Sequence, residues 1–330
     1  MGRAKPGRFA TVITLAAVCA APATWAAHDL APELRARVDA LKDSASAGPT
    51  TPENALSRVE VLWDWANAIA LQGEHLPLNL SLFARLVMTA DSPDDINRLA
   101  LNSIDRYIYE LSLRDDHPGG IGTLAVEAPE VIRARSHQTV VVRYTVGSVP
   151  MAEGGRIMLA RHFMTDAEAL QRDDPSADGY VSIHSSNPSA TWKPETTRWF
   201  GPHGGFRPPT PVWTFRLEDA ALQEGDTVTL TYGDTSGGGR GMAIQTFSND
   251  ASPLPIYVDL ENSGHFLSLP LPTYRVVGTD MVAVHGIVPS IVAPGEPFRL
   301  RIRPEDHYFN LATGAVPALT VSLNGEVFQQ

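Results

Sequence analysis

A glycine-rich run, GDTSGGGRG (Gly233–Gly241), has the composition of a loop that could hold a phosphate. A Walker-type loop needs a lysine followed by Ser or Thr at the start of a helix, because the lysine and the helix N-terminus bind the anion. Here an arginine stands near the lysine's place, and no Ser or Thr follows it. The flanking runs TVTLTY and MAIQTF have strand character, so the sequence predicts a hairpin whose glycines supply positive φ angles.

Four further residues could form a metal site: His162, Asp173, Asp174 and His184. Imidazole and carboxylate groups together bind divalent transition metals, and an Asp/His pair can also act as a general acid and base. These residues would converge if the two strands flanking the acidic run QRDDPSADGY were neighbours. The same run is typical of a surface loop with Asp–Pro turn chemistry. We adopt the loop interpretation and predict no catalytic residue, no bound metal and no cofactor.

Aromatic side chains crowd the segment from Thr191 to Trp213, where Pro and Gly residues predict an irregular loop. Trp192, Trp199, His203 and Trp213 are the candidates for stacking on a glycan or a peptide, since long aromatic loops often bind such partners. The same rings could instead plug the open end of a β-sandwich or pack against a helical domain. A mixed arrangement would turn Trp213 inward and leave Trp199 exposed.

Residues 1–26 have the form of an export signal, with three basic residues, a short apolar run and small residues before the expected cleavage point. An apolar run this short does not span a membrane comfortably. We therefore expect a periplasmic or secreted protein without an integral membrane segment after cleavage. Cys19 is the only cysteine and lies in the signal, so the mature chain is expected to have neither a disulfide nor a thiolate metal site.

The net charge of the chain is −11, and it becomes −14 when the three basic residues of the signal are removed. The sequence contains no cluster of Lys and Arg residues that would form a basic patch on this acidic chain. Nucleic acids and anionic membrane surfaces are therefore poor candidates as partners.

Residues 27–117 have the periodicity of a helical domain. Thr51 and Ser92 each begin a pattern of cap hydroxyl, proline and acidic residue that is typical of a helix start. Apolar residues follow both at spacings of three and four, and Trp63 and Trp65 are expected to pack in the core. The predicted helices cover residues 32–41, 51–72, 82–88 and 92–111.

Residues 118–280 change to short strands separated by turn residues, which predicts an antiparallel β-sandwich. The run TVVVRYTVG alternates, so Val140, Val142 and Tyr144 should face the core. The predicted strands cover 139–147, 155–163, 179–185, 211–217 and 226–233.

Residues 281–330 begin a second, immunoglobulin-like β pattern. Phe298, Leu300 and Ile302 share one face, and Asn324-Gly325 predicts a hairpin turn. These roughly 50 residues are about half of an immunoglobulin-like sandwich, which takes about 100. An incomplete sandwich leaves an inner face uncovered, so we expect either further chain or strands that join the preceding domain.

Several of these segments together resemble an exported bacterial family catalogued as domain of unknown function 3604. They are TVVVRYTVGSVPMAEGGRIMLARHF, QRDDPSADGYVSI, LTYGDTSGGGRGMAIQTF and SIVAPGEPFRLRIRPEDHYFN. The resemblance covers about Gly122 to the C-terminus and implies β-sandwich domains placed ahead of a metal-dependent hydrolase of the amidohydrolase or PHP type. The metal-binding half of that family opens with a Gly-Asp-Leu-His motif. This sequence has only Gly233-Asp234-Thr235, so no metal ligand is carried over.

The sequence thus predicts an α + β protein, with an N-terminal helical domain followed by an antiparallel immunoglobulin-like β-sandwich region whose last sandwich is incomplete. The expected function is that of an exported, non-catalytic accessory region, with a downstream catalytic domain or a separate catalytic protein as its partner. One alternative is a periplasmic glycan- or peptide-binding module that uses the aromatic segment. A second is a metal-dependent hydrolase with an unrecognised site.

Overall fold

A computed structural model describes residues 29–72, 94–160, 165–199, 210–270, 273–315 and 318–329. The predicted export signal, the predicted helix over 82–88, His162 and His203 lie outside these residues, as does the side chain of Trp199. Among the helices of the described ranges, none combines the length and apolar character that a membrane span requires.

Three described helices precede the β structure: α1 (Pro32–Ala47), α2 (Pro52–Ala70) and α4 (Asp94–Asp116). The predicted start of α2 is confirmed. Pro52 occupies its first turn, and the Asn54 side chain accepts a hydrogen bond of 2.8 Å from the Thr51 backbone N–H. Helix α1 continues beyond the predicted end to Ala47, because the first residue that favours a helix end is Gly48.

The helices pack around their own apolar core. Trp65 is 1% exposed and is buried with Leu62 and Ile69 from α2 and Ile108 from α4. The expectation that both tryptophans are buried is wrong for Trp63, which is 46% exposed. Two positions along a helix correspond to a rotation of about 200°, so the two rings cannot face the same core.

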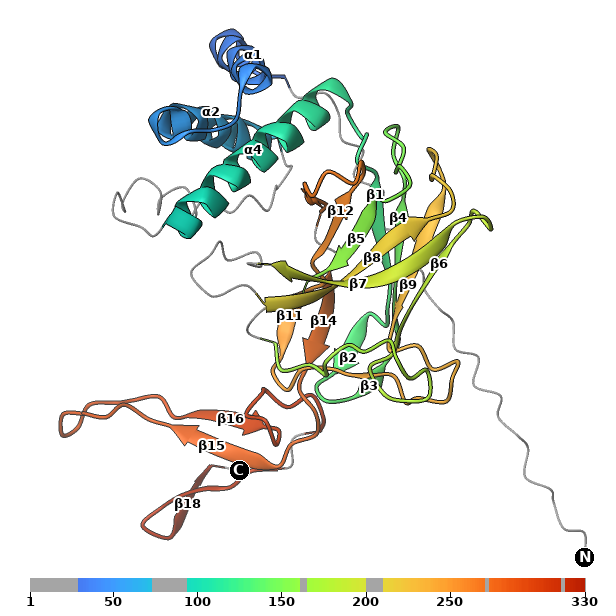
Figure 1. The fold of residues 1–330 in the computed structure, drawn as a ribbon. Helices are drawn as coiled ribbons and strands as arrows, with labels where there is room; N and C mark the ends of the chain where they lie inside the picture. The colour runs from blue at the N-terminus through green and yellow to red at the C-terminus, as the bar shows by residue number, and fades with distance from the viewer. Residues whose placement is uncertain are drawn as a thin grey trace, which may run out of the picture.

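Two antiparallel sheets form the centre of the molecule (Figure 1). The first has the order β1-β4-β9-β6, with β1 (Thr123–Glu127), β4 (Val140–Thr145), β9 (Thr227–Tyr232) and β6 (Val181–Ser185). The second has the order β13-β12-β5-β8-β7, with β13 (Leu267–Ser268), β12 (Ile256–Asp259), β5 (Arg156–Leu159), β8 (Thr210–Glu218) and β7 (Thr191–Trp199). The described fold is therefore α + β, and its two main sheets are antiparallel, as predicted.

The two sheets share one core. Val140, Val142 and Tyr144 alternate inward along β4 and are 0% exposed, which confirms the predicted facing. They belong to the same buried cluster as Ile157 of β5 and Val258 of β12, so the apolar faces of the two sheets pack together.

Two smaller sheets lie beside the main ones. One has the order β11-β14-β2, with β11 (Asn249–Pro253), β14 (Thr273–Val277) and β2 (Val131–Arg133), and its β14–β2 pair is parallel. The other is a two-residue pairing of β3 (His137–Gln138) with β10 (Met242–Ala243). Neither sheet was evident in the strand pattern of the sequence.

Helix α4 is joined to the second sheet by a buried ion pair. The side chains of Glu110 and Arg114 are 0% and 4% exposed, and Arg114 Nη2 lies 2.7 Å from Glu110 Oε1. The Ser268 hydroxyl of β13 donates to Glu110 Oε2 at 3.0 Å, and Arg114 donates to the Ser268 carbonyl. The helical and β parts are therefore connected through charged groups that water does not reach.

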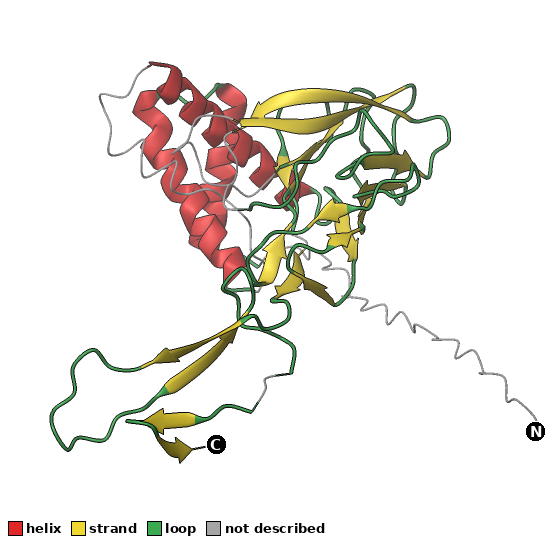
Figure 2. Cartoon of the chain, turned by 90° about the horizontal axis from the view of Figure 1, so that it is seen from below, coloured by secondary structure: helices red, strands yellow, loops and turns green. Residues whose placement is uncertain are grey.

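The C-terminal residues form two hairpins that extend away from the sandwich in both ribbon views (Figures 1 and 2). They are β15 (Ala283–Ile287) with β16 (Arg301–Glu305) and β17 (Val321–Leu323) with β18 (Glu326–Gln329). The predicted turn in the second hairpin is confirmed, since Asn324 and Gly325 both have positive φ angles, 51° and 89°.

The first hairpin is anchored at its base by Asp306. This carboxylate is 2% exposed and accepts hydrogen bonds of 2.8 to 2.9 Å from the backbone N–H groups of Thr279, Tyr308 and Asn310. Asn310 in turn donates to the Thr246 carbonyl at 2.7 Å. The base of the hairpin is thus fixed to the sandwich, while its strands project outward.

Candidate functional site

The glycine-rich run Gly233–Gly241 connects two strands, as predicted, and no helix follows it. It is not a hairpin, however, because β9 pairs with β4 and β6, whereas β10 pairs with β3. The run is a crossover between two sheets. The alternating pattern of its flanks identified the strands but carried no information about their pairing.

The glycines let this crossover approach a second loop, residues 165–180, at backbone distance. A Cβ atom on Gly237 would lie 2.2 Å from the Pro175 carbonyl oxygen, and one on Gly239 would lie 2.7 Å from that of Ala177. Such distances exclude any larger residue without a shift of the backbone. The close approach brings Arg240 of the crossover onto Asp178 of the second loop.

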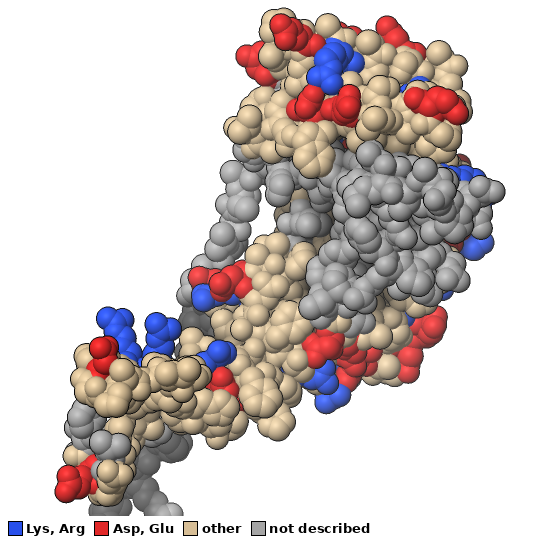
Figure 3. All heavy atoms as spheres, turned by 90° about the vertical axis from the view of Figure 1, so that its left-hand side faces the viewer, with Lys and Arg blue, Asp and Glu red and all other residues tan. Residues whose placement is uncertain are grey.

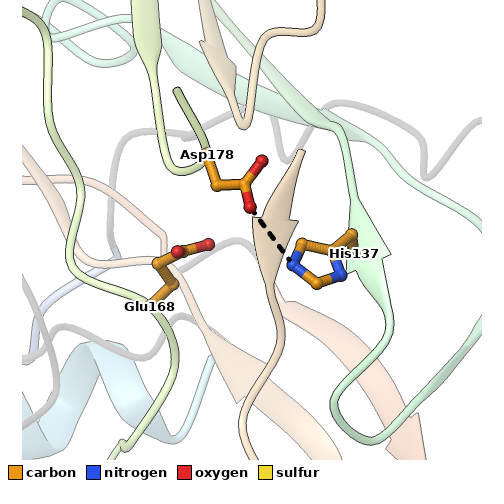
Figure 4. A group of neighbouring side chains, drawn as sticks. All are labelled: His137, Glu168 and Asp178. Atoms are coloured by element: carbon orange, nitrogen blue, oxygen red, sulfur yellow. Dashed lines mark ion pairs between the residues drawn. The ribbon is translucent and has the colours of Figure 1, made fainter. Parts of the chain in front are cut away.

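Asp178 is held by both the backbone and the side chain of Arg240. The Arg240 N–H donates to Asp178 Oδ1 at 2.7 Å, and its Nε donates to Oδ2 at 2.8 Å. The hydrogen bond from the guanidinium, with the one from the backbone, holds the pKa of Asp178 below its usual value. The carboxylate is therefore ionised at neutral pH. It also lies 3.6 Å from His137 Nε2 (Figure 4).

Glu168 is held opposite His137 by strand β10. Its backbone N–H donates to the Ala243 carbonyl, and its carboxylate Oε2 accepts from the Ala243 N–H, both at 2.9 Å. Ala243 is the register partner of His137 in the β3–β10 pair. The pairing of these two short strands thus places an imidazole and a carboxylate at neighbouring positions.

His137, Glu168 and Asp178 together form a three-residue cluster (Figure 4). One potential ligand atom from each lies within 4.8 Å of the others, and all three residues are half-buried. An imidazole beside two carboxylates can bind a divalent cation or exchange a proton with a small molecule. Among the described residues, this is the group whose geometry suits a metal ion.

Of the metal ligands suggested by the sequence, the three that the structure describes (Asp173, Asp174 and His184) do not form such a group. Asp174 accepts hydrogen bonds from the backbone and hydroxyl of Ser176, at 2.9 and 2.6 Å, and thereby forms the predicted turn. The backbone N–H of Asp173 donates to the Gln171 side chain, while His184 lies exposed on β6. His162 lies outside the described residues.

The aromatic segment is more regular than expected. Residues 191–199 form strand β7, which pairs with β8 over nine residues, so the prediction of an irregular loop is wrong for this part. Pro194 is tolerated because β7 is the edge strand of its sheet, where a proline's missing N–H interrupts no ladder on the outer side.

The two aromatic candidates whose side chains are described contact the protein itself. Trp192 packs partly buried against the sandwich core. Trp213 Nε1 donates to the Leu170 carbonyl at 2.9 Å, and the Arg172 guanidinium lies 4.8 Å from the centre of the Trp213 ring. Through these two contacts, Trp213 attaches the loop over residues 165–180 to strand β8. This loop carries Glu168 and Asp178, so the ring supports the cluster.

No protein-family model matches this sequence. No curated protein matches it. A solved structure that is similar in part is a cohesin module from a family 33 glycoside hydrolase of Clostridium perfringens, at 11% sequence identity. The comparison covers 48% of this chain and 98% of the cohesin module, with a TM-score of 0.27. A TM-score this low does not establish a shared fold.

Proposed function

We propose that this chain is an exported, non-catalytic accessory region whose C-terminal hairpins, β15–β16 and β17–β18, dock onto the β structure of a catalytic partner. The partner is a metal-dependent hydrolase, encoded downstream in the same chain or as a separate protein. The observation that carries the proposal is the exposed apolar surface of these hairpins. The export signal suggested by residues 1–26 supports a periplasmic or secreted location.

The apolar surface is concentrated in one part of the molecule. Twelve of the sixteen large apolar side chains that are exposed among the described residues lie between Val282 and Val327. Ile291 is 91% exposed, Phe309 71% and Phe298 57%. In Figure 3 the projecting C-terminal part, which holds the two hairpins, shows mostly uncharged residues with a few basic and acidic groups. Exposed apolar side chains gathered in one part of a molecule are typical of an interaction site.

Strand β16 and the residues just before it expose both apolar and basic side chains. Ile302 lies on β16, whereas Phe298 and Leu300 precede the strand, and all three are at least 39% exposed. Arg301 and Arg303, which flank Ile302 on β16, are also exposed. The strand begins only at Arg301, so a common face for Phe298, Leu300 and Ile302 stays a prediction. An isolated two-stranded hairpin is marginally stable in water, so an apolar face left open in this way needs a cover.

Another β-sheet has the right geometry to bury the exposed apolar side chains of the hairpins. Each hairpin forms a two-stranded sheet, and neither pairs with another strand of the described chain. Residues 311 and 312 bond to the outer edge of β16 at its base, through the Glu305–Leu311 bridge and the hydrogen bond from the Ala312 N–H to the Pro304 carbonyl. Beyond this base, an extended strand could add to the hairpin edges by backbone hydrogen bonds. An added sheet would also bury Phe298, Leu300 and Ile302 and complete an immunoglobulin-like sandwich. The resemblance to the front part of an exported hydrolase family supports a hydrolase as the source of that sheet.

The glycan- or peptide-binding alternative has less support. Trp192 and Trp213 are partly buried against the chain's own core and loop, which reduces the ring surface left for stacking on a ligand. The metal-dependent hydrolase alternative has less support as well, because the ligands suggested by the sequence do not converge among the described residues.

We predict that Ile302→Glu weakens the complex with the hydrolase about 30-fold, because a charge would replace an apolar contact of the size of an interface hot spot, about 2 kcal/mol. The measurement is co-expression of the mature chain with the adjacent reading frame that encodes a Gly-Asp-Leu-His motif, followed by titration of the purified partners.

Leu56→Glu is the matched control. Leu56 is 50% exposed on helix α2, far from the hairpins in the sequence, and the substitution adds the same charge. It should leave the affinity unchanged. Absence of any complex, or equal effects of Ile302→Glu and Leu56→Glu, would contradict the proposed docking.

A further inference from the structure

We propose that His137, Glu168 and Asp178 bind one divalent transition-metal ion, of the kind represented by Zn²⁺ or Mn²⁺. The accessory role proposed above neither requires this site nor supplies it. The three residues come from strand β3 and from two positions of the loop over 165–180, and they are brought together only by folding. Figure 4 shows their three side chains directed toward a common space.

The ligands are held in place before any ion binds. His137 lies on a paired strand, and Glu168 is fixed to Ala243 through two hydrogen bonds of 2.9 Å. Asp178 is fixed through its Oδ1 by the backbone N–H of Arg240, a hydrogen bond that does not depend on the arginine side chain. A carboxylate has lone pairs on both oxygens, so Glu168 retains ligand capacity after accepting a hydrogen bond at Oε2. A metal would therefore meet a largely ordered ligand set.

The donor types select the class of ion. An imidazole nitrogen with two carboxylates suits Zn²⁺, Mn²⁺ or Fe²⁺, whereas Ca²⁺ and Mg²⁺ prefer oxygen ligands alone. Ligands at about 2.0 to 2.2 Å from a zinc ion lie no more than about 4 Å apart. The present ligand atoms lie within 4.8 Å of one another. Binding then requires an inward movement of less than about 1 Å, which the loop carrying Glu168 and Asp178 can supply.

Arg240 occupies the position of a competing cation. Its guanidinium donates to Asp178 Oδ2, the same oxygen that faces His137. The Arg240 side chain is 70% exposed, so water can solvate it once it leaves the carboxylate. A doubly charged ion would displace it from Asp178. Removal of the arginine side chain should therefore strengthen metal binding, which a purely structural ion pair would not do.

The test is calorimetric titration of the mature chain, purified without a polyhistidine tag, with Zn²⁺ and separately with Mn²⁺. We expect one ion per chain. Arg240→Gln should raise the affinity about tenfold, and His137→Ala should lower it at least 100-fold. Ca²⁺ should bind at least 100-fold more weakly than Zn²⁺. Glu168→Gln keeps an acceptor for the Ala243 N–H and serves as a second ligand variant if His137→Ala does not fold.

His184→Ala and Asp174→Asn are the matched controls, because both remove a potential ligand outside the cluster. Both should bind the ion as the unaltered chain does. The proposal is overturned if neither the unaltered chain nor Arg240→Gln binds Zn²⁺ or Mn²⁺. It is also overturned if binding survives in a folded His137→Ala or Glu168→Gln variant, or if it is lost in His184→Ala.

Discussion

Replacing Glu110 by alanine is expected to lower the free energy of unfolding by about 3 to 5 kcal/mol, since it removes the carboxylate that pairs with the buried Arg114 guanidinium. The Ser268 hydroxyl and N–H would also lose their acceptor. Because Ser268 belongs to β13, the variant should loosen the attachment of helix α4 to the second sheet. Urea unfolding followed by circular dichroism measures the loss of stability.

Two comparison variants distinguish two causes of the lost stability: the broken buried ion pair and the mere removal of a side chain. Asp116 lies on the same helix, and its side chain is 51% exposed beside Lys42, so Asp116→Ala should change stability by no more than about 1 kcal/mol. The double variant Glu110→Met/Arg114→Met removes both charges and should be more stable than Glu110→Ala. A Glu110→Ala variant as stable as Asp116→Ala would show that the pair does not hold the helix to the sheet.

Trp65→Ala is expected to destabilise the helical part by about 3 to 5 kcal/mol, because a large ring leaves a cavity among Leu62, Ile69 and Ile108. Denaturant unfolding, followed by the helical circular dichroism signal, measures the change. The neighbouring ring supplies the control. Trp63 is 46% exposed, so Trp63→Ala should cost well under 1 kcal/mol. Similar losses for the two variants would contradict the assignment of the buried face of α2.

Local signals predicted the elements well. The Thr51-Pro52 start of helix α2 depends on neighbouring residues alone, and the structure contains it. The alternation along β4 likewise depends on one strand having one buried face, and Val140, Val142 and Tyr144 face the core. Trp63 shows the limit of this reasoning. It lies two residues before Trp65, so the apolar pattern must be followed residue by residue to tell which of the two rings lies on the buried face of the helix.

Pairing between distant strands could not be predicted in the same way. The glycine-rich run was expected to join two paired strands, but β10 pairs with β3, which is only two residues long. A strand this short has no recognisable pattern, and its partner is chosen by the packing of the whole sheet. The same pairing creates the cluster, because it sets His137 beside Ala243 and therefore beside Glu168.

The residues of the candidate metal site consequently had no signal in the sequence. His137 and Glu168 are separated by 31 positions and belong to no spacing motif. Asp178 lies in the acidic run that was considered, four positions after Asp174, which instead stabilises the turn at Ser176. The sequence thus identified the correct loop but not the residue within it that faces the histidine.

The exposed face of the C-terminal hairpins was, by contrast, foreseeable from composition. Phe298, Leu300 and Ile302 alternate with arginines, and a pattern of this kind requires something to cover the apolar side. The sequence could not show whether the preceding sandwich supplies that cover. In the described residues it does not, since β15 and β16 form a separate two-stranded sheet that pairs with no strand of the sandwich.

The proposed accessory role is tested most directly by hydrogen–deuterium exchange at β15 and β16, in the mature chain alone and in its complex with the hydrolase. We predict that the free chain exchanges these amides rapidly while β4 and β9 remain protected, and that the complex slows the exchange in β15 and β16. Protection of β15 and β16 equal to that of β4 and β9 in the free chain would contradict the account, because the hairpins would then need no partner.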